Sequence, residues 1–168
     1  GVALGYARER VQGTEIDKFK DVEAERVTID RHPDVKRMLF TMKARVKGVR
    51  ALLFRAARYA DEAQSADDEA DRERAHNVLE LLTPLCKSYG SDAGYEVATM
   101  ALQTLGGAGY TADWPVEQAV RDVKVASIYE GANGIQALDL IGRKLGHNGG
   151  AGFLALTGAI EGTVEKVK

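Results

Sequence analysis

The chain has 168 residues, of which 45% are hydrophobic and 29% charged, and this is the composition of one globular domain with a sizeable core. Its formal net charge of -2 gives no electrostatic reason to bind nucleic acid or an acidic membrane surface. The single cysteine excludes an internal disulfide and any metal site built from several cysteines.

The first residues have neither a starting methionine nor a helix cap. Gly1-Val2-Ala3-Leu4 resembles the later part of a helix, so we expect a piece of a longer protein. No signal-peptide pattern is present, and no apolar run reaches about 18 residues, so neither a secretory leader nor a membrane-spanning helix is predicted.

The first helix is predicted to end near Val11, with Gly13 as its stop. Residues 14–33 keep no apolar period and are predicted to form a long connection. The next helix begins at His32-Pro33-Asp34, where proline suits the first turn. Its apolar residues keep helical spacing as far as Ala60.

A third helix is predicted from about Arg72 to Leu105, after an acidic loop over residues 64–71. The apolar period continues across Pro84, which favours a kink over a break, and Cys86 falls within it as a buried thiol. Two more helices are expected, one starting at Pro115 and one from about Gly134 to Leu145 with Asn133 as its N-cap. No strand alternation appears, so the predicted fold class is all-α.

Two charged motifs on these helices have simple structural explanations. Glu73-Arg74-Ala75-His76 has the E-x-x-H spacing of di-iron bundles, but such a site needs the motif twice, so we predict no metal site. Arg121-Asp122 is predicted to form a structural salt bridge.

Three glycines follow the long third helix. Gly106, Gly107 and Gly109 permit a backbone turn with exposed N–H groups that a ligand can approach closely. The turn is not a dinucleotide fingerprint, because a helix precedes it where a strand is required. A ligand contact and a plain helix end both remain open from the residues alone.

One carboxylate, Glu130, stands at an elbow between two apolar-periodic runs. Gly131, Asn133 and Gly134 interrupt the helical pattern there, which predicts a helix, a tight turn and a second helix. A carboxylate that lies beside apolar walls and faces a cavity can act as a general base. The alternative is a solvated turn residue, which the local pattern supports at least equally well.

The stretch from Ala101 to Leu145 resembles the C-terminal helical domain of the acyl-CoA dehydrogenase family. The matching motifs, in order, are Gln103-x-x-Gly106-Gly107-x-Gly109-Tyr110, Trp114-Pro115-Val116-Glu117, Arg121-Asp122, Ile128-Tyr129-Glu130-Gly131 and Ile135-Gln136. Arg8-Glu9-Arg10-Val11-Gln12-Gly13 is similar to a further family element. The continuation through Leu140 is similar to a branch with a longer C-terminus, that of 3-methylmercaptopropionyl-CoA dehydrogenase.

The resemblance implies an up-down helical bundle with a four-helix core over residues 1–146, followed by a linker and the start of an extension over 147–168. It implies that Glu130 is the base that removes the α-proton of an acyl-CoA, with Tyr129 and Gly131 beside the thioester. It also implies that FAD is bound by the following residues, the last two through backbone groups: Arg10, Gln103, Gly106, Gly107, Ala132 and Gly134.

By the same resemblance the partners are an acyl-CoA substrate, electron-transfer flavoprotein as electron acceptor, and further copies of the chain in a homodimer or homotetramer. The expected compartment is the cytoplasm, or the mitochondrial matrix in a eukaryote. We expect the 168-residue chain alone neither to hold FAD tightly nor to turn over substrate. The rival hypothesis is a non-catalytic oligomerisation module, and a weaker one, a DNA-associated relative, is disfavoured by the net charge.

Overall fold

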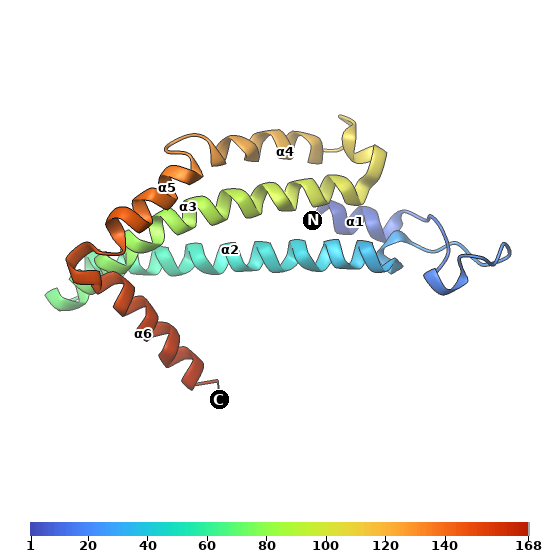
Figure 1. Ribbon diagram of the computed structural model, residues 1–168. Helices are drawn as coiled ribbons and strands as arrows, with labels where there is room; N and C mark the ends of the chain where they lie inside the picture. Colours follow the sequence, from blue (N-terminus) through green and yellow to red (C-terminus); the bar gives the residue numbers. More distant parts are fainter. Residues whose placement is uncertain (168) are drawn as a thin grey trace. The chain divides into compact units, whose positions relative to one another are not determined.

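The computed structural model describes residues 1–167, and within them the chain is helical (Figure 1). The α-helices are α1 (Val2–Glu9), α2 (Pro33–Ser65), α3 (Glu69–Leu105), α4 (Val116–Lys124), α5 (Asn133–Asp139) and α6 (Ala151–Glu165). The extended pairing in this part of the chain is one isolated antiparallel bridge, Val11 with Thr28. The predicted all-α class is therefore confirmed.

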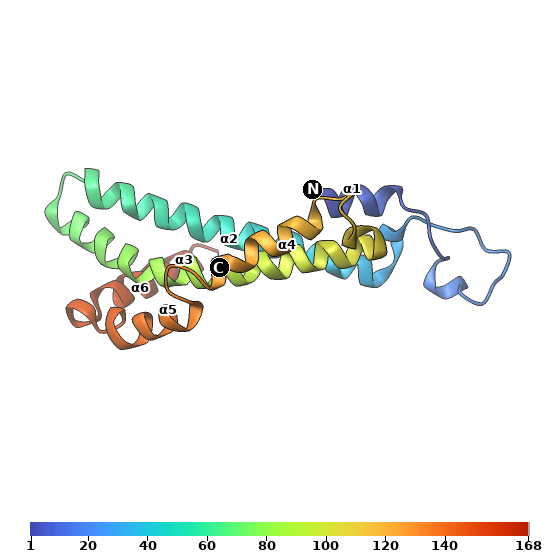
Figure 2. The same ribbon diagram turned by 90° about the horizontal axis from the view of Figure 1, so that it is seen from above.

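The chain divides into two compact units, each of which uses part of α2 and part of α3. Unit 1 comprises Gly1–Lys47 and Ala93–Val125, and unit 2 comprises Gly48–Asp92 and Ala126–Lys168. Within each unit the two long helices lie side by side, as both Figure 1 and Figure 2 show.

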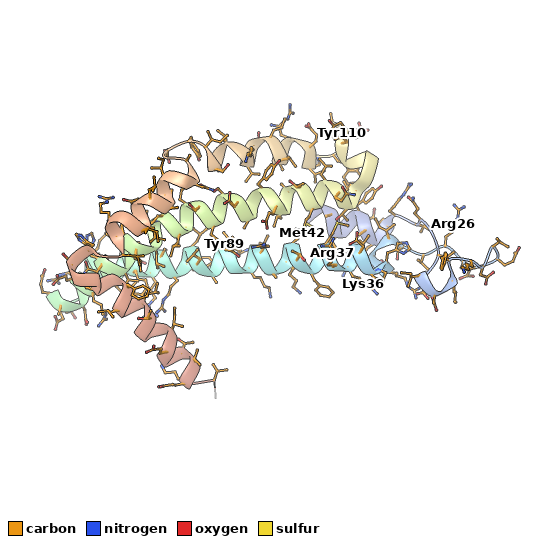
Figure 3. The ribbon with its side chains drawn as sticks, in the orientation of Figure 1. Arg26, Lys36, Arg37, Met42, Tyr89 and Tyr110 are labelled. Carbon is orange, nitrogen blue, oxygen red and sulfur yellow. The ribbon has the colours of Figure 1, made fainter. Side chains whose placement is uncertain are left out.

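The core of unit 1 gathers side chains from α1, α2, α3 and the start of α4. Met42 of α2, labelled in Figure 3, is buried there. Tyr6 and Trp114 pack edge to face, with ring centroids 5.3 Å apart. The buried residues of this core are Ala3, Met38, Met42, Leu105 and Val116. Burial of these apolar surfaces is what fixes α1 and α4 on the two long helices.

The connection after α1 is more ordered than its sequence predicts. Helix α1 ends at Glu9, so the predicted stop at Gly13 is wrong. Gly13 instead has a φ of +71° within the connection, and its carbonyl accepts the Val27 amide at 2.9 Å. Two short 3₁₀ helices, Ile16–Lys18 and Ile29–Arg31, lie within the stretch that is predicted to be a long connection.

Unit 2 is built on the turn between α2 and α3. The Asp68 carboxylate accepts the Ala70 amide at 2.7 Å and so caps the start of α3. Helix α3 continues through Pro84, as the unbroken apolar period predicted. The buried residues of the core are Tyr59, Ala75, Val78 and Leu82, with Ala155 and Leu156 of α6 packed against them.

The residues that follow α5 contact α3 again. Helix α5 passes into one π-helical turn, Leu140–Lys144, rather than continuing as an α-helix to Leu145. The residues predicted as a linker form a short helical turn, His147–Gly150, in which Asn148 donates a hydrogen bond to Asn77 at 2.9 Å. Gly152 then lies so close to α3 that an added Cβ would stand 2.4 Å from the Asn77 carbonyl oxygen.

The Lys144–Glu80 ion pair links the π-helical turn to α3. The Lys144 side chain is 9% exposed and its Nζ lies 2.9 Å from a Glu80 carboxylate oxygen. This hydrogen bond holds the pKa of Glu80 below its ordinary value of 4.5. Because the folded pKa is depressed, the stabilisation is complete above that value and is lost as the pH falls through the folded pKa.

We therefore expect Glu80→Gln to unfold at lower urea concentration than the parent chain near about pH 7. The difference should be smaller near about pH 3, because the Glu80 carboxylate of the parent chain becomes protonated as the pH falls through its folded pKa. Urea titrations at the two pH values, followed by circular dichroism, measure the difference. A deficit of the same size at both pH values would contradict an electrostatic origin.

Candidate functional site

Glu130 lies in the turn between the short helix Val125–Ser127 and α5, and its side chain is exposed. Its φ of +52° is a left-handed conformation that side chains other than glycine rarely adopt. Gly131 follows with φ +83°. Two consecutive left-handed residues reverse the chain sharply, which gives the predicted tight turn between two helices. The Glu130 carboxylate is exposed, as in the solvated-turn alternative, rather than enclosed by apolar walls of the described residues.

The turn is closed by Gln136. Its Nε2 donates to the carbonyl oxygen of Glu130 at 3.2 Å and to that of Gly131 at 3.4 Å. An added Cβ on Gly131 would stand 2.9 Å from the same nitrogen, so a side chain there would displace the Gln136 amide. The φ of Gly131 is what favours glycine at this position, and a larger side chain would also disturb the Gln136 contact.

Asn133 joins the turn to α3 through its side-chain amide. Its oxygen accepts from Lys87 Nζ at 2.9 Å, and its Nδ2 donates to Ser91 Oγ at 2.9 Å and to a carboxylate oxygen of Asp92 at 2.8 Å. Lysine can only donate, so the amide oxygen must face it. The helix N-cap is Ala132, which makes no side-chain cap, and the predicted capping role of Asn133 is therefore wrong.

The other predicted residues near Glu130 differ in exposure. Tyr129 is 52% exposed and Gly131 is half-buried. The carbonyl of Ala132 accepts the Ile135 amide at 2.8 Å, which starts α5. Gly134 is exposed, and an added Cβ would meet no atom within 4 Å. The backbone at Gly134 is therefore accessible from outside the chain.

The remaining predicted residues belong to unit 1. Arg10 follows α1 and is exposed, with its guanidinium 3.3 Å from the Gln12 side-chain oxygen. Gln103 is exposed on the last turn of α3. Gly106 has φ +61°, and both it and Gly107 are exposed and would meet no atom within 4 Å through an added Cβ.

Gly109 differs from the other two glycines of this bend. It is buried, and an added Cβ would stand 2.6 Å from the Leu102 carbonyl oxygen. Gly109 is thus a packing residue that lets the chain fold back on α3, whereas Gly106 and Gly107 leave their backbone open. Tyr110, labelled in Figure 3, is 81% exposed beside them.

The charged residues for which the sequence predicted only a structural role make contacts within their own helix. Arg121 forms an ion pair with Glu117, one helical turn earlier, at 3.1 Å, and Asp122 accepts from Gln118 at 2.7 Å. The predicted Arg121–Asp122 bridge is wrong because neighbouring residues on a helix point in different directions. No metal-binding group of three or more His, Cys, Asp or Glu side chains occurs within residues 1–167. In the same residues no helix combines the length and apolar character needed to span a membrane.

These features define an all-helical domain with a carboxylate on a constrained helix-to-helix turn and an accessible glycine bend. The model of the acyl-CoA dehydrogenase C-terminal domain matches residues 1–146. The chain belongs to this family, and the recognition made from its motifs is confirmed.

Relatives support the assignment over nearly the whole chain. A broad-specificity linear acyl-CoA dehydrogenase, FadE5, from Mycobacterium tuberculosis is 42% identical over 97% of this chain and 27% of its own length. The 3-methylmercaptopropionyl-CoA dehydrogenase of Ruegeria pomeroyi is 38% identical over 98% of this chain and 28% of its own. The chain therefore spans about a quarter of the curated relatives it matches.

A solved structure agrees with the fold. The butyryl-CoA dehydrogenase of Megasphaera elsdenii superimposes with a TM-score of 0.66 and is 26% identical, over 85% of this chain and 31% of that one. Sequence reasoning placed Glu130 but missed the roles of Gln136, Lys87 and Ser91. The signal for Gln136 was present, because its amide side chain lies in the first turn of the predicted helix that follows the carboxylate.

Proposed function

We propose that this chain supplies the catalytic base of an acyl-CoA dehydrogenase. Glu130 removes the α-proton of an acyl-CoA thioester while the β-hydrogen leaves as hydride, so that an α,β double bond forms. The observation that supports this role is the constrained turn. Glu130 has φ +52°, Gln136 donates to its carbonyl oxygen, and Asn133 attaches the following residues to α3. Backbone strain of this kind persists where the surroundings hold it, and it is frequent at functional sites.

The chemistry suits a carboxylate. The thioester carbonyl acidifies the α-carbon, and a carboxylate held within hydrogen-bond reach can take the proton as the bond breaks. Glu130 is exposed in this chain, so bound substrate and the rest of the enzyme would have to exclude water around it. Such exclusion favours proton transfer because it removes the solvent that stabilises the charged carboxylate.

Acyl-CoA dehydrogenases are FAD-dependent oxidoreductases, and FAD, when bound, accepts the hydride. The donors on this chain fit an anionic dinucleotide. Arg10 presents an exposed guanidinium, which can bind a phosphate through two N–H groups. Gly106 and Gly107 leave their backbone open beside the exposed Gln103, and Ala132 and Gly134 would contribute backbone groups.

The isolated chain is expected to bind FAD weakly and to be inactive, because it spans only about a quarter of its relatives and its proposed ligands are exposed. Purified alone, it should be colourless and show no flavin absorbance in the visible range. Copurification of near-stoichiometric flavin would contradict this expectation.

We also propose that the complete enzyme acts in the cytoplasm, or in the mitochondrial matrix of a eukaryote, as a homodimer or homotetramer that passes electrons to electron-transfer flavoprotein. The experiment that tests the central proposal is Glu130→Gln in the complete enzyme. Loss of dehydrogenation with FAD retained supports a catalytic base, and unchanged activity supports the rival oligomerisation module.

A further inference from the structure

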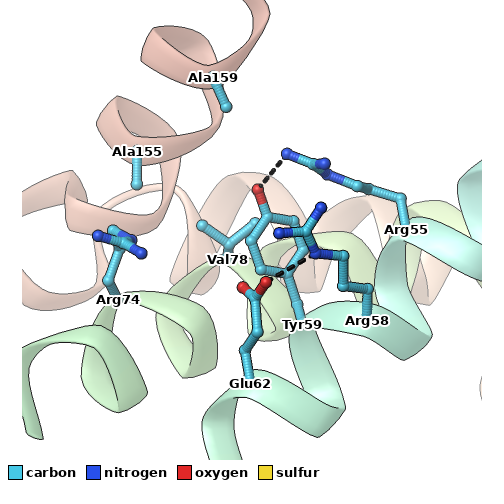
Figure 4. Close-up of a pocket in the computed structure, with 8 residues that line it drawn as sticks. All are labelled: Arg55, Arg58, Tyr59, Glu62, Arg74, Val78, Ala155 and Ala159. Atoms are coloured by element: carbon cyan, nitrogen blue, oxygen red, sulfur yellow. Dashed lines mark hydrogen bonds and ion pairs between the residues drawn. The ribbon is translucent and has the colours of Figure 1, made fainter. Parts of the chain in front are cut away.

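A pocket lies in unit 2, between α2, α3 and α6 (Figure 4). Its volume is about 230 Å³. This is below the range of about 300–1,000 Å³ that is usual for small-molecule sites, which favours a small ligand. The residues that line it are Arg55, Arg58, Tyr59, Glu62, Arg74, Val78, Ala155 and Ala159.

The pocket is positively charged. Its lining carries three guanidinium groups and one carboxylate. Arg58 is paired with that carboxylate, Glu62, at 2.7 Å, and Arg74 is paired with Asp71, outside the lining, at 2.8 Å. Arg55 has no carboxylate partner within residues 1–167. The local field therefore favours an anion.

The floor of the pocket holds a buried donor. Tyr59 is 7% exposed, and its hydroxyl accepts a hydrogen bond from Arg55 at 2.9 Å, which Figure 4 shows. Within the described residues the hydroxyl proton has no acceptor. The Arg55 guanidinium also lies over the Tyr59 ring, with its Cζ 4.8 Å from the centroid. Tyr59 thus positions Arg55 and also presents to the pocket an O–H group that has no acceptor among the described residues.

Helix α6 contributes only short side chains to the pocket. Ala155 and Ala159 face the pocket from this helix, and their short side chains do not fill it. The lining therefore combines polar side chains from α2 and α3 with short apolar side chains from α6.

We propose that this pocket binds a phosphate group, either free or as the end of a phosphomonoester. Arg55 and Arg74 bind its oxygens, and the Tyr59 hydroxyl donates a third hydrogen bond. Planar guanidinium groups match phosphate geometry, and hydrogen bonds to charged groups are the strong ones. Glu62 faces the same space and competes for Arg58. Because salt screens the attraction between phosphate and guanidinium groups, binding should weaken as ionic strength rises.

Isothermal titration of the chain with inorganic phosphate and with glycerol 3-phosphate, at matched ionic strength, tests the proposal. We expect saturable binding of at least one of them, and the tighter ligand identifies the source. We expect Arg55→Gln, Arg74→Gln and Tyr59→Phe each to weaken binding, the arginine variants by about tenfold. Tyr59→Phe keeps the ring that packs in the core, so it reports on the hydroxyl alone.

Arg50→Gln is the matched control, because Arg50 is exposed on the same helix outside the pocket. Melting curves by circular dichroism show whether each variant is folded. The proposal is overturned if neither phosphate compound binds, if acetate binds equally tightly, or if the pocket variants bind like Arg50→Gln. Binding is measured without turnover, so this result is independent of the role proposed for Glu130.

Discussion

Replacing Glu130 with glutamine in the complete enzyme should reduce acyl-CoA dehydrogenation by about 10²- to 10⁴-fold, the usual contribution of a positioned general base. Glutamine keeps the size and hydrogen-bonding ability of the side chain but cannot take a proton. Flavin content and acyl-CoA affinity should therefore remain close to those of the parent enzyme. Steady-state rates with an artificial electron acceptor, and anaerobic flavin reduction in a single turnover, measure the loss.

Two variants make this result specific. Glu161→Gln changes an exposed glutamate on α6 and should leave the rate unchanged. Glu130→Asp keeps a carboxylate but shortens its reach, so it should recover part of the activity without restoring all of it. If Glu130→Gln reduced flavin with acyl-CoA as fast as the parent enzyme, the base would have to be another group.

The long helices were predictable because their signals are local and repeated. Pro33 and Asp34 mark the start of α2, and the apolar period carries α3 through Pro84. The turn at Glu130 was predictable because glycines and an asparagine interrupt two periodic runs. The left-handed φ of Glu130 itself was not, since side chains other than glycine adopt it rarely and only where surrounding contacts fix it.

The contacts that hold the site depend on residues distant in sequence. Asn133 follows the residue that caps α5, and a preference for N-cap positions cannot distinguish the cap from the next residue. Its partners lie more than 40 positions away on α3, and no local pattern marks them. The π-helical turn after α5 was also missed. It contains Lys144, whose partner Glu80 lies far away in sequence on α3.

Asn133→Ala should lower the free energy of unfolding by about 1–3 kcal/mol, because Lys87, Ser91 and Asp92 lose their shared partner. Ser91 is buried and cannot readily exchange that partner for water. The turn that carries Glu130 would also lose its attachment to α3. Urea unfolding of the parent chain and the variant measures the first effect.

The second effect distinguishes a positioning residue from a merely stabilising one. If Asn133 holds the turn in place, Asn133→Ala in the complete enzyme should lower kcat per bound flavin by up to about 100-fold, because a small displacement of the base slows proton transfer. The KM for acyl-CoA should change little. Asn148→Gly is the matched control. It removes a hydrogen bond to Asn77 of the same helix α3, but from a turn that does not carry Glu130. Glycine also tolerates the φ of +48° at position 148. Equal losses of kcat in both variants would show that Asn133 acts through general stability, whereas a loss confined to Asn133→Ala would assign it the positioning of the base.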